Sequence, residues 1–264
     1  MKINCKILII AGSDSSGGAG IQADIKTATV NGVYAMTAIT AITAQNTTGV
    51  KSIISISPKE IYNQISFSAN DIYPDSIKVG MLHDVKIIKQ VLKSFKKYKF
   101  KNIVIDPVMI AKGGQKLIND QSIDHLKNLL FPFSTIITPN IPEAEALIGN
   151  KILTLTDMIY AAKLLLGFGP KFVLIKGGHN NNKLIEDVLV SKNSINIFKN
   201  NRINTKNTHG TGCTLSTAIA CFLAKKFTVN ESCKLAIHYV HKAIKLNPKF
   251  GRGHGPINHM AILK

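Results

Sequence analysis

The sequence NTHGTGCTL, residues 207–215, places a Gly-Thr-Gly turn directly before a predicted helix. The apolar residues of that helix recur at the spacing of one helix face, namely Leu215, Ala218, Ile219, Phe222 and Leu223. A glycine turn at a helix start leaves backbone N–H groups unpaired and aimed at one point, where the helix dipole adds positive charge. Gly210, Thr211, Gly212 and Cys213 are therefore predicted to bind an anion. Taken alone, the same pattern also fits a loop followed by an amphipathic surface helix.

Outside this turn, short β-branched runs alternate with helical patterns, which is typical of strand-helix-strand units and a mostly parallel sheet. The predicted strands are 7–10, 33–43, 77–80, 103–106, 135–138 and 172–176, and a hairpin is predicted over 186–190 and 194–198. Two helical faces are also predicted: Val85, Ile88, Leu92 and Phe95 after the N-cap Asp84, and Ile21, Ile25 and Ala28 before Gly32. The pattern predicts an α/β fold in one domain over residues 1–264.

Polar residues stand where four of the predicted strands end. Asp14, Asp106, Asn140 and Lys176 each follow an apolar run. In an open parallel sheet, ligands bind beyond the carboxyl ends of the strands. These four side chains are therefore expected to lie around one crevice.

The formal net charge of the 264-residue chain is +18, which invites a nucleic-acid-binding interpretation. The distribution of the lysines argues against it, because they are scattered, and the densest cluster, 93–99, ends a predicted helix, where cations suit the dipole. The charge would still attract an anionic substrate. No nucleic-acid partner is expected.

The four cysteines, Cys5, Cys213, Cys221 and Cys233, form no C-x-x-C pair and have no histidine at metal-ligand spacing. Free thiols in a reducing cytoplasm are therefore expected. The uncharged stretch 27–50 is long enough to cross a membrane, but its Thr, Asn, Gln and Gly residues argue against a membrane span.

The loop GSDSSGGAG, residues 12–20, follows the first strand and contains four glycines. It matches neither the G-x-G-x-x-G fingerprint nor the P-loop of ATPases. Such loops are common, although their glycines let a flat ligand approach the backbone closely.

Asn140 and Glu143 lie three residues apart around a predicted helix start. Glu143 could be an ordinary partner of the helix dipole, but with Asp106 and the anion turn nearby, Asp106, Glu143 and Asn140 better suit a Mg²⁺ site. Lys176 precedes two glycines and is placed to clamp a phosphate, although a single lysine is more often a solvated surface charge. Together these residues are the parts of a phosphoryl-transfer site.

Eight segments of the chain, in order, resemble the hydroxymethylpyrimidine and phosphomethylpyrimidine kinases of thiamine biosynthesis, members of the ribokinase-like superfamily. They are AGSDSSGGAGIQADIKT, AITAQNTTGV, KVGML, DPVM, TPNIPEAEAL, IKGGH, TKNTHGTGCTLS and GHGPINH. The resemblance implies a ribokinase-like three-layer α/β/α fold with a mostly parallel central sheet. It also implies a cytoplasmic homodimer that uses ATP and Mg²⁺.

The implied activity is phosphorylation of 4-amino-5-hydroxymethyl-2-methylpyrimidine to its monophosphate, and of the monophosphate to the diphosphate. By the same resemblance, the pyrimidine pocket is lined by Gly12, Ala19, Asp24, Gln45, Met81 and Val108. The side-chain types fit, because a glutamine amide complements an amino group beside a ring nitrogen, and methionine and valine can sandwich a flat ring. His209 is expected to help hold the anion turn, and 111–115 to form a mobile flap.

The wider superfamily usually has an aspartate base where this chain has Cys213. A thiol is a poor base at neutral pH, but a helix N-terminus can lower its pKa. Only the first phosphorylation needs a proton removed, because a phosphate monoester is largely ionised at pH 7. We therefore expect Cys213→Ala to slow the first step more than the second, with Asp106 as the next candidate base.

Two other functions compete with this interpretation. A pyridoxal kinase shares the fold and the phosphate turn and acts on a hydroxymethyl group of a pyridine, although Gln45 and Met81 favour the pyrimidine. A basic nucleic-acid-binding protein without catalysis is the alternative from a different class, and it draws only on the net charge of +18.

Overall fold

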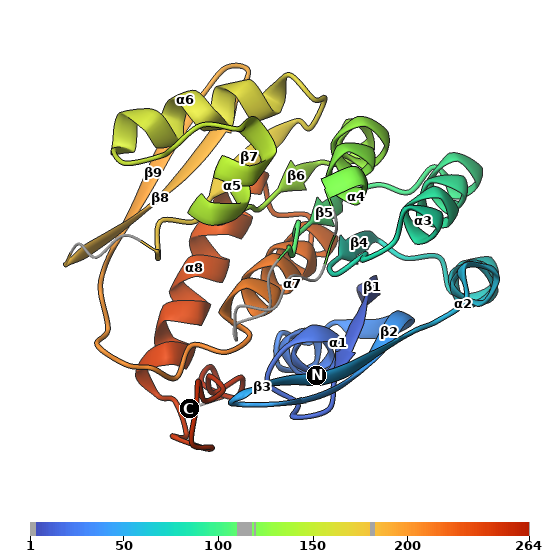
Figure 1. Ribbon diagram of the computed structural model, residues 1–264, viewed down its shortest axis with the longest axis horizontal. Helices are drawn as coiled ribbons and strands as arrows, with labels where there is room; N and C mark the ends of the chain where they lie inside the picture. The colour runs from blue at the N-terminus through green and yellow to red at the C-terminus, as the bar shows by residue number, and fades with distance from the viewer. Residues whose placement is uncertain (1–3, 110–117, 119, 180–182, 264) are drawn as a thin grey trace.

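A computed structural model of the protein describes residues 4–109, 118, 120–179 and 183–263. Nine strands within these residues form one sheet in the order β3-β2-β1-β4-β5-β6-β7-β8-β9 (Figure 1). Their bounds are β1 Lys6–Asp14, β2 Tyr34–Asn46, β3 Gly49–Ser55, β4 Ser76–Val79, β5 Ile103–Ile105, β6 Ile136–Ile137, β7 Phe172–Ile175, β8 Leu184–Ser191 and β9 Ile195–Asn201.

The six central strands run parallel, since β1 pairs in parallel with β2 and β4, and the parallel pairing continues to β7. Strands β3, β8 and β9 are antiparallel to their neighbours. The predicted strands and hairpin are confirmed. Strand β3 was not predicted, because each of its seven residues is exposed or half-buried and its sequence carries no clear apolar alternation.

Helices cover both faces of this sheet, which confirms the three-layer α/β/α prediction (Figure 1). On one face lie α1 Gly20–Val30, α7 Thr211–Ala224 and α8 Val229–Lys245. On the other lie α2 Pro58–Asp71, α3 Val85–Tyr98, α4 Asp120–His125, α5 Ile141–Ile148 and α6 Leu155–Leu166. A π-helical turn, Leu126–Leu130, and a 3₁₀ turn, Phe131–Phe133, follow α4.

Alternation of side chains along β1 supplies both layers of the core. Leu8 and Ile10 pack with the α2–α6 layer, whereas Ile7 and Ile9 pack with α1 and α7. Successive side chains of a strand point to opposite faces, so a strand covered on both sides must be apolar throughout. This explains why the central strands were recognisable from the sequence.

Helix α7 departs from the predicted single apolar face. Its residues from Thr214 to Cys221 are all buried, whereas Phe222 is only half-buried. Small side chains let α1 and α8 pack closely around it, and its hydroxyl groups hydrogen-bond inside the protein: Thr214 to His259, Ser216 to Asp106 and Thr217 to Asp24. The helix is a central element of the fold and not a surface helix.

The two other predicted helical faces are confirmed in part. Asp84 is the N-cap of α3 and accepts a hydrogen bond from Lys86 N, as predicted. In α1 the buried face includes Ile21 and Ala28, but it runs through Asp24 and leaves Ile25 exposed. Residues 27–50 form the end of α1, strand β2 and the start of β3. No helix among the described residues has the length and apolar character needed to cross a membrane.

Candidate active site

The carboxyl ends of the parallel strands open onto one cavity of about 960 Å³. The four polar strand-end residues all line it, namely Asp14, Asp106, Asn140 and Lys176. This confirms that they converge on one crevice. The residues between 208 and 213 lie on the same wall, so the glycine turn faces the cavity as well.

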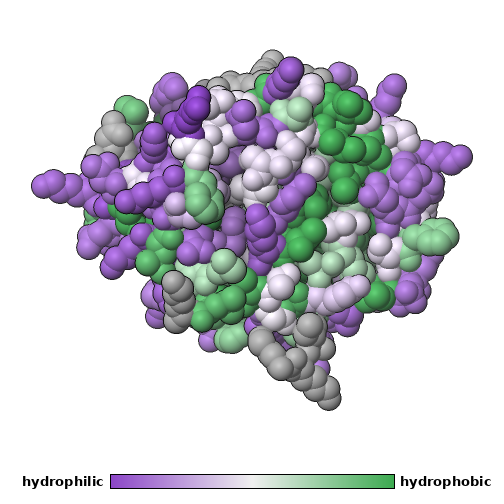
Figure 2. All heavy atoms as spheres, turned by 90° about the horizontal axis from the view of Figure 1, so that it is seen from below, coloured by the Kyte–Doolittle hydropathy of each residue, from purple (hydrophilic) through white to green (hydrophobic). Residues whose placement is uncertain are grey.

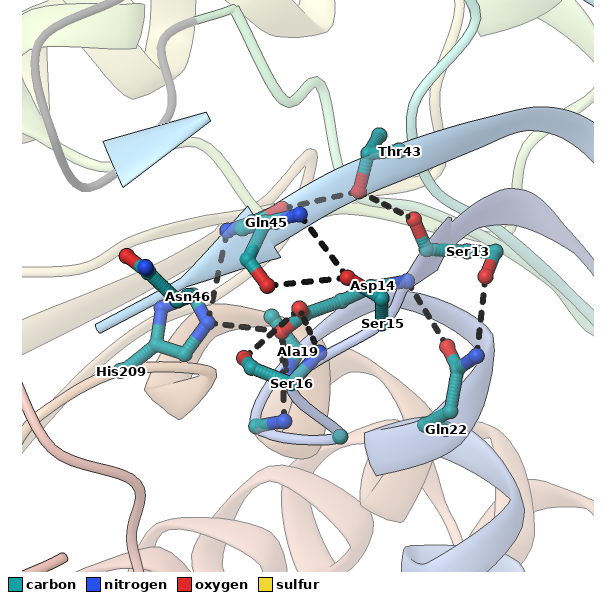
Figure 3. A network of polar contacts seen from close by, with 12 residues as sticks. Ser13, Asp14, Ser15, Ser16, Ala19, Gln22, Thr43, Gln45, Asn46 and His209 are labelled. Carbon is teal, nitrogen blue, oxygen red and sulfur yellow. Dashed lines mark hydrogen bonds and ion pairs between the residues drawn. The ribbon is translucent and has the colours of Figure 1, made fainter. Parts of the chain in front are cut away.

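Asp14, the last residue of β1, organises the loop that follows it (Figure 3). Its Oδ1 accepts hydrogen bonds from the backbone N and the hydroxyl of Ser16, at 2.9 and 2.7 Å. Its Oδ2 accepts from the backbone N of Gly18 and Ala19, at 3.2 and 2.8 Å. Burial opposes ionisation, but the hydrogen bonds from His209 and Ser16 outweigh it and hold the pKa of Asp14 below its ordinary value. Asp14 therefore shapes the loop as a carboxylate.

His209 joins this loop to the glycine turn. Its Nε2 lies 2.7 Å from Asp14 Oδ2, and its backbone N donates to Gly255 O. The backbones meet beside it: Gly210 has a φ of +80°, and a Cβ there would lie 1.8 Å from Gly18 O. A side chain at either Gly18 or Gly210 would push the loop and the turn apart, so both glycines are required by this contact.

The start of α7 is open toward the cavity. Gly210 is its N-cap without a side-chain cap, and no acidic residue lies in its first turn. The backbone N–H groups of Gly212 and Cys213 find no acceptor among the described residues. Such a helix start is suited to bind an anion.

Lys176 lies against this turn and is paired with Asp106. Its Nζ is 2.8 Å from Asp106 Oδ1 and 3.9 Å from Glu143 Oε2, and a Cβ on Gly212 would lie 3.3 Å from it. Burial acts to lower the pKa of Lys176, but Asp106 and Glu143 outweigh it and raise the pKa above its ordinary value. A permanently charged ammonium therefore borders the anion turn.

Asp106 is buried and its oxygens already have partners. Oδ1 accepts from Lys176 and from the Thr138 hydroxyl at 3.1 Å, and Oδ2 accepts from the Ser216 hydroxyl at 3.3 Å. Burial opposes its ionisation, but Lys176 and Lys78 together hold its pKa below the ordinary value. Asp106 is thus a carboxylate that holds Lys176.

Asn140 and Glu143 form a reciprocal capping box at the start of α5. Asn140 Oδ1 accepts from Glu143 N at 2.9 Å, and Glu143 Oε2 accepts from Asn140 N at 2.8 Å. The helix-start interpretation of Glu143 is therefore confirmed, and both residues also line the cavity. Burial raises the pKa of Glu143 to about 7, with Lys176 opposing and Asp106 adding to the shift. In the part of the chain that the structure describes, no three His, Cys, Asp or Glu side chains are grouped as a metal-binding set.

Asp24 needs a correction, since it does not line the cavity. Its side chain is fully buried, with Oδ2 2.6 Å from Lys78 Nζ and Oδ1 accepting from the Thr217 hydroxyl at 2.7 Å. Burial raises the pKa of Asp24, while Lys78 opposes the shift. Burial also acts to lower the pKa of Lys78, but Asp24 and the neighbouring acids raise it. The short contact and the Thr217 hydrogen bond favour the ionised pair, whose Lys78 reaches the cavity wall in place of Asp24.

The other predicted pyrimidine residues lie where they were expected. Gly12, Ala19, Gln45, Met81 and Val108 all line the cavity. A Cβ on Gly12 would lie 2.4 Å from Met81 Cε, so this glycine makes room for the methionine. Their position agrees with the prediction, and their contact with a ligand stays a prediction.

Cys213 also lines the cavity, but its chemistry differs from the expectation. Burial raises the pKa of its thiol to about 11; Lys78 and a hydrogen bond from Gly20 N oppose the shift, whereas Asp24 and Asp106 add to it. The expected lowering by the helix start is therefore wrong, because desolvation is the larger effect here. At neutral pH the group is a thiol.

No side chain at the opposite end of the cavity stands out in the sequence. Asp187 on β8 accepts a hydrogen bond from Gly177 N at 2.8 Å, and burial raises its pKa to about 6. Around it the cavity is lined by Ile185, Arg202, Thr205, Lys206, Ile237, Val240 and Ile244. These residues come from the hairpin, the segment after it and α8, which all read as ordinary fold elements in the sequence. The predicted flap, 111–115, lies outside the described residues.

Comparison with known proteins places the chain among kinases. A family model described as phosphomethylpyrimidine kinase matches residues 14–258. The hydroxymethylpyrimidine/phosphomethylpyrimidine kinase of Bacillus subtilis is 45% identical, over 97% of this chain and 95% of the relative. The crystal structure of phosphomethylpyrimidine kinase from Clostridium difficile is 44% identical with a TM-score of 0.82, over 91% of this chain and 100% of that one. An ADP complex of Bacillus subtilis pyridoxal kinase is 38% identical with a TM-score of 0.92, over 98% of each chain.

Proposed function

The chain belongs to the phosphomethylpyrimidine kinase family, and from this membership we propose that it phosphorylates 4-amino-5-hydroxymethyl-2-methylpyrimidine and then its monophosphate with ATP, in thiamine biosynthesis. One observation carries the proposal. The Lys176 ammonium, held by Asp106, borders an open helix start in the middle of one cavity. A hydroxymethyl group from one end and a triphosphate from the other would meet at that point.

The pyrimidine occupies the end of the cavity next to the loop after β1. Met81 and Val108 are the apolar walls for the flat ring, and Gln45 supplies a hydrogen-bonding amide. The Asp14–His209 contact fixes the loop relative to the turn, and so sets the distance between the ring and the phosphate site. A positioned hydroxyl needs no further orientation when the nucleotide arrives.

The transferred phosphoryl group lies over the start of α7. The N–H groups of Gly212 and Cys213 and the ammonium of Lys176 stabilise the charge on its equatorial oxygens. Phosphoryl transfer has a loose transition state, so positioning and charge stabilisation supply most of the rate. A thiol with a pKa of about 11 is not needed as a base in such a step.

The nucleotide occupies the opposite end of the cavity, beside the last helix, α8. Arg202 and Lys206 supply positive charge there, and Ile237, Val240 and Ile244 on α8 offer an apolar surface to a purine. Asp187 fixes the backbone of Gly177, directly after Lys176. The ADP complex of the similar pyridoxal kinase supports ATP as the phosphoryl donor.

A magnesium ion is the expected cofactor, and part of the predicted ligand set fits it. Asn140 and Glu143 line the cavity, and Glu143, with a pKa of about 7, can give up its proton when a divalent cation arrives. Asp106 fits less well as a direct ligand, because its Oδ1 lies 2.8 Å from the Lys176 ammonium, whereas Glu143 Oε2 lies 3.9 Å from it. We assign the ion to the Asn140 and Glu143 side, with waters and phosphate oxygens as its other ligands. When bound, it neutralises phosphate charge.

We also propose that the enzyme is a cytoplasmic homodimer whose subunit is one domain. One sheet runs through all the described strands, which supports a single domain.

The proposed dimer contact is the antiparallel ribbon that β2 and β3 form at one edge of the sheet. In this ribbon Ile42 on β2 faces Ile54 on β3, and the two residues are 49% and 65% exposed. Figure 2, the view from below Figure 1, shows hydrophobic groups exposed among hydrophilic ones on that side of the molecule. The ribbon is the proposed contact, and Ile54→Lys is expected to give monomers in sedimentation.

Product analysis tests the proposed function directly. Purified protein is incubated with ATP, Mg²⁺ and, separately, the hydroxymethylpyrimidine, its monophosphate and pyridoxal, and the products are identified by mass spectrometry. Formation of the pyrimidine mono- and diphosphate is expected, while phosphorylation of pyridoxal alone would assign the chain to the competing activity. Lys176→Met is expected to slow the formation of both pyrimidine products by about 10²–10³-fold. Lys192→Met, in the exposed turn between β8 and β9, is the matched control.

A further inference from the structure

The side-chain amide of Gln45 lies between two polar neighbours (Figure 3). In one of the two orientations of the amide, both contacts are mismatched. On one side, the Thr43 hydroxyl lies 3.3 Å from Gln45 Oε1. Thr43 has a single hydroxyl hydrogen, and it donates this hydrogen to the Ser13 carbonyl at 2.7 Å. A carbonyl can only accept, so toward Gln45 the Thr43 oxygen is an acceptor. The contact with Oε1 therefore sets two acceptors against each other.

On the other side, Gln45 Nε2 lies 3.4 Å from His209 Nε2. The same ring nitrogen lies 2.7 Å from Asp14 Oδ2. A carboxylate can only accept, so His209 Nε2 carries a hydrogen and is a donor, in the neutral and in the charged ring alike. This second contact sets two donors against each other.

The backbone of Gln45 is fixed, so the conflict concerns the amide alone. Its N donates to Ser15 Oγ at 2.8 Å, and the Ser15 hydroxyl donates to its carbonyl at 2.9 Å. A rotation of the amide by about 180° about its last side-chain bond exchanges oxygen and nitrogen. Nε2 then donates to the Thr43 oxygen, and Oε1 faces the His209 N–H, which shares its single hydrogen between Asp14 at 2.7 Å and this longer contact.

We propose that Thr43 and the Asp14–His209 pair hold the Gln45 amide with Nε2 toward Thr43 and Oε1 toward His209, and that this fixed orientation selects the ring edge of the substrate. The selection rests on the proposed function. A ligand with an amino group beside a ring nitrogen places the amino group near Oε1, on the His209 side, and the ring nitrogen near Nε2. The 4-oxo analogue carries a carbonyl beside a ring N–H, so it presents the reverse pattern and meets the wrong amide atoms. Thr43 and His209 are thus positioning residues.

An NMR measurement on the ligand-free protein tests the orientation without any reference to activity. The side-chain amide signals of Gln45 are assigned by their loss in Gln45→Glu, and nuclear Overhauser effects from the two amide hydrogens are recorded. Contacts with the side-chain protons of Thr43 are expected. Contacts with the ring protons of His209 instead would overturn the proposed orientation.

Kinetics on the 4-amino substrate and its 4-oxo analogue test the selection. In Thr43→Val the acceptor beside Nε2 is lost, and the ratio of the two kcat/KM values is expected to fall by about two- to tenfold, the effect of one hydrogen bond. Thr43→Ser keeps the hydroxyl and is expected to keep the wild-type ratio. Equal losses for both substrates in Thr43→Val would show a purely structural role and refute the selection. If the wild-type protein phosphorylates neither compound, the proposed function and the selection built on it both fail, while the NMR contacts still decide the orientation.

Discussion

Two lysine–aspartate pairs flank the start of α7, and they differ in what surrounds them. In the first, Lys78 Nζ lies 2.6 Å from Asp24 Oδ2, and both side chains are 0% exposed. In the second, Lys176 Nζ lies 2.8 Å from Asp106 Oδ1, with the lysine side chain 13% exposed toward the cavity. The distances are similar, but the Lys176 ammonium is partly exposed beside Gly212, whereas Lys78, although it lines the cavity wall, is fully covered.

The fully buried Lys78–Asp24 pair, called the sealed pair below, joins three elements. Asp24 on α1 also accepts a hydrogen bond from Thr217 on α7, while Lys78 comes from β4. A buried charge without its partner is expensive, so this pair is required for the fold once either member is present. The Lys176–Asp106 pair, called the open pair below, lies at the cavity and can exchange some of its contacts for water or phosphate oxygens. We therefore expect loss of the sealed pair to lower stability and loss of the open pair to lower the rate.

The largest effect is expected for Lys78→Met. It leaves the Asp24 carboxylate buried beside Thr217 alone, and should lower the free energy of unfolding by about 3–5 kcal/mol, measured by urea denaturation. Lys6→Met is the control, because its pair with Asp75 is about one-third exposed and contributes less than about 1 kcal/mol.

A second substitution distinguishes a missing charge partner from poor packing of methionine. Asp24→Asn combined with Lys78→Met removes the unpaired charge but keeps an acceptor for Thr217, and should recover most of the lost stability. If Lys78→Met costs no more than Lys6→Met, the sealed pair is not ionised and the comparison of the two pairs fails.

Lys176→Met should have the next largest effect, on the rate. Removal of one group that stabilises transition-state charge lowers kcat by about 10²–10³-fold. The melting temperature should change much less than in Lys78→Met, because Asp106 keeps its hydrogen bonds from Thr138 and Ser216 and borders the cavity. Steady-state kinetics and thermal denaturation of the same preparations check both parts. A loss of kcat below tenfold would remove Lys176 from the phosphoryl path.

Asp187 shows what burial does to an acid for which the described residues provide no ion pair, and it predicts a pH dependence. Its folded-state pKa is raised from 3.8 to about 6, so its contribution to stability is full below pH 4 and is lost as the pH rises through 6. Asp187→Asn cannot ionise and keeps an acceptor for Gly177 N. At pH 7 the variant should therefore be more stable than the wild type by roughly 1–3 kcal/mol, with little difference at pH 4. An equal difference at both pH values would refute the raised pKa.

The fold was largely predictable because its strands are buried on both faces. Unbroken apolar runs such as 7–10 and 103–105 can be recognised without knowledge of their neighbours. Strand β3 was missed because its residues lie at the sheet edge with no buried face. Helix α7 was recognised as a helix, but the burial of every residue from Thr214 to Cys221 depends on α1 and α8, which a single-helix pattern does not contain.

The site was predictable where sequence position alone decides it. Asp106 and Lys176 follow apolar strands, and the strand order brings them within 2.8 Å. Lys78 was missed because a lysine inside a four-residue strand gives no sign of a partner 54 residues away. Asp24 was placed in the pocket by resemblance, whereas its buried contacts place it behind the wall. The pKa of Cys213 depends on the surrounding protein, which sequence does not give.

The smallest effect is expected for Cys213, which lies between the two pairs. Lys78 acts to lower the pKa of its thiol, Asp24 and Asp106 act to raise it, and burial takes it to about 11. At pH 7 about one molecule in 10⁴ would carry the thiolate, which is too few for an efficient general base. Cys213→Ser should therefore change kcat for both phosphorylation steps by less than about tenfold, and by similar factors.

This outcome differs from that expected of a catalytic thiolate, and the pH dependence separates the two. A thiolate base would serve the alcohol of the first step and not the ionised monophosphate of the second. The rate of the first step would then keep rising with pH toward the thiol pKa of about 11 in the wild type, and Cys213→Ser would flatten that rise. Parallel pH–rate profiles for the two proteins would instead leave charge stabilisation by Lys176 and the glycine turn as the source of the rate, and Cys213 as a wall of the cavity.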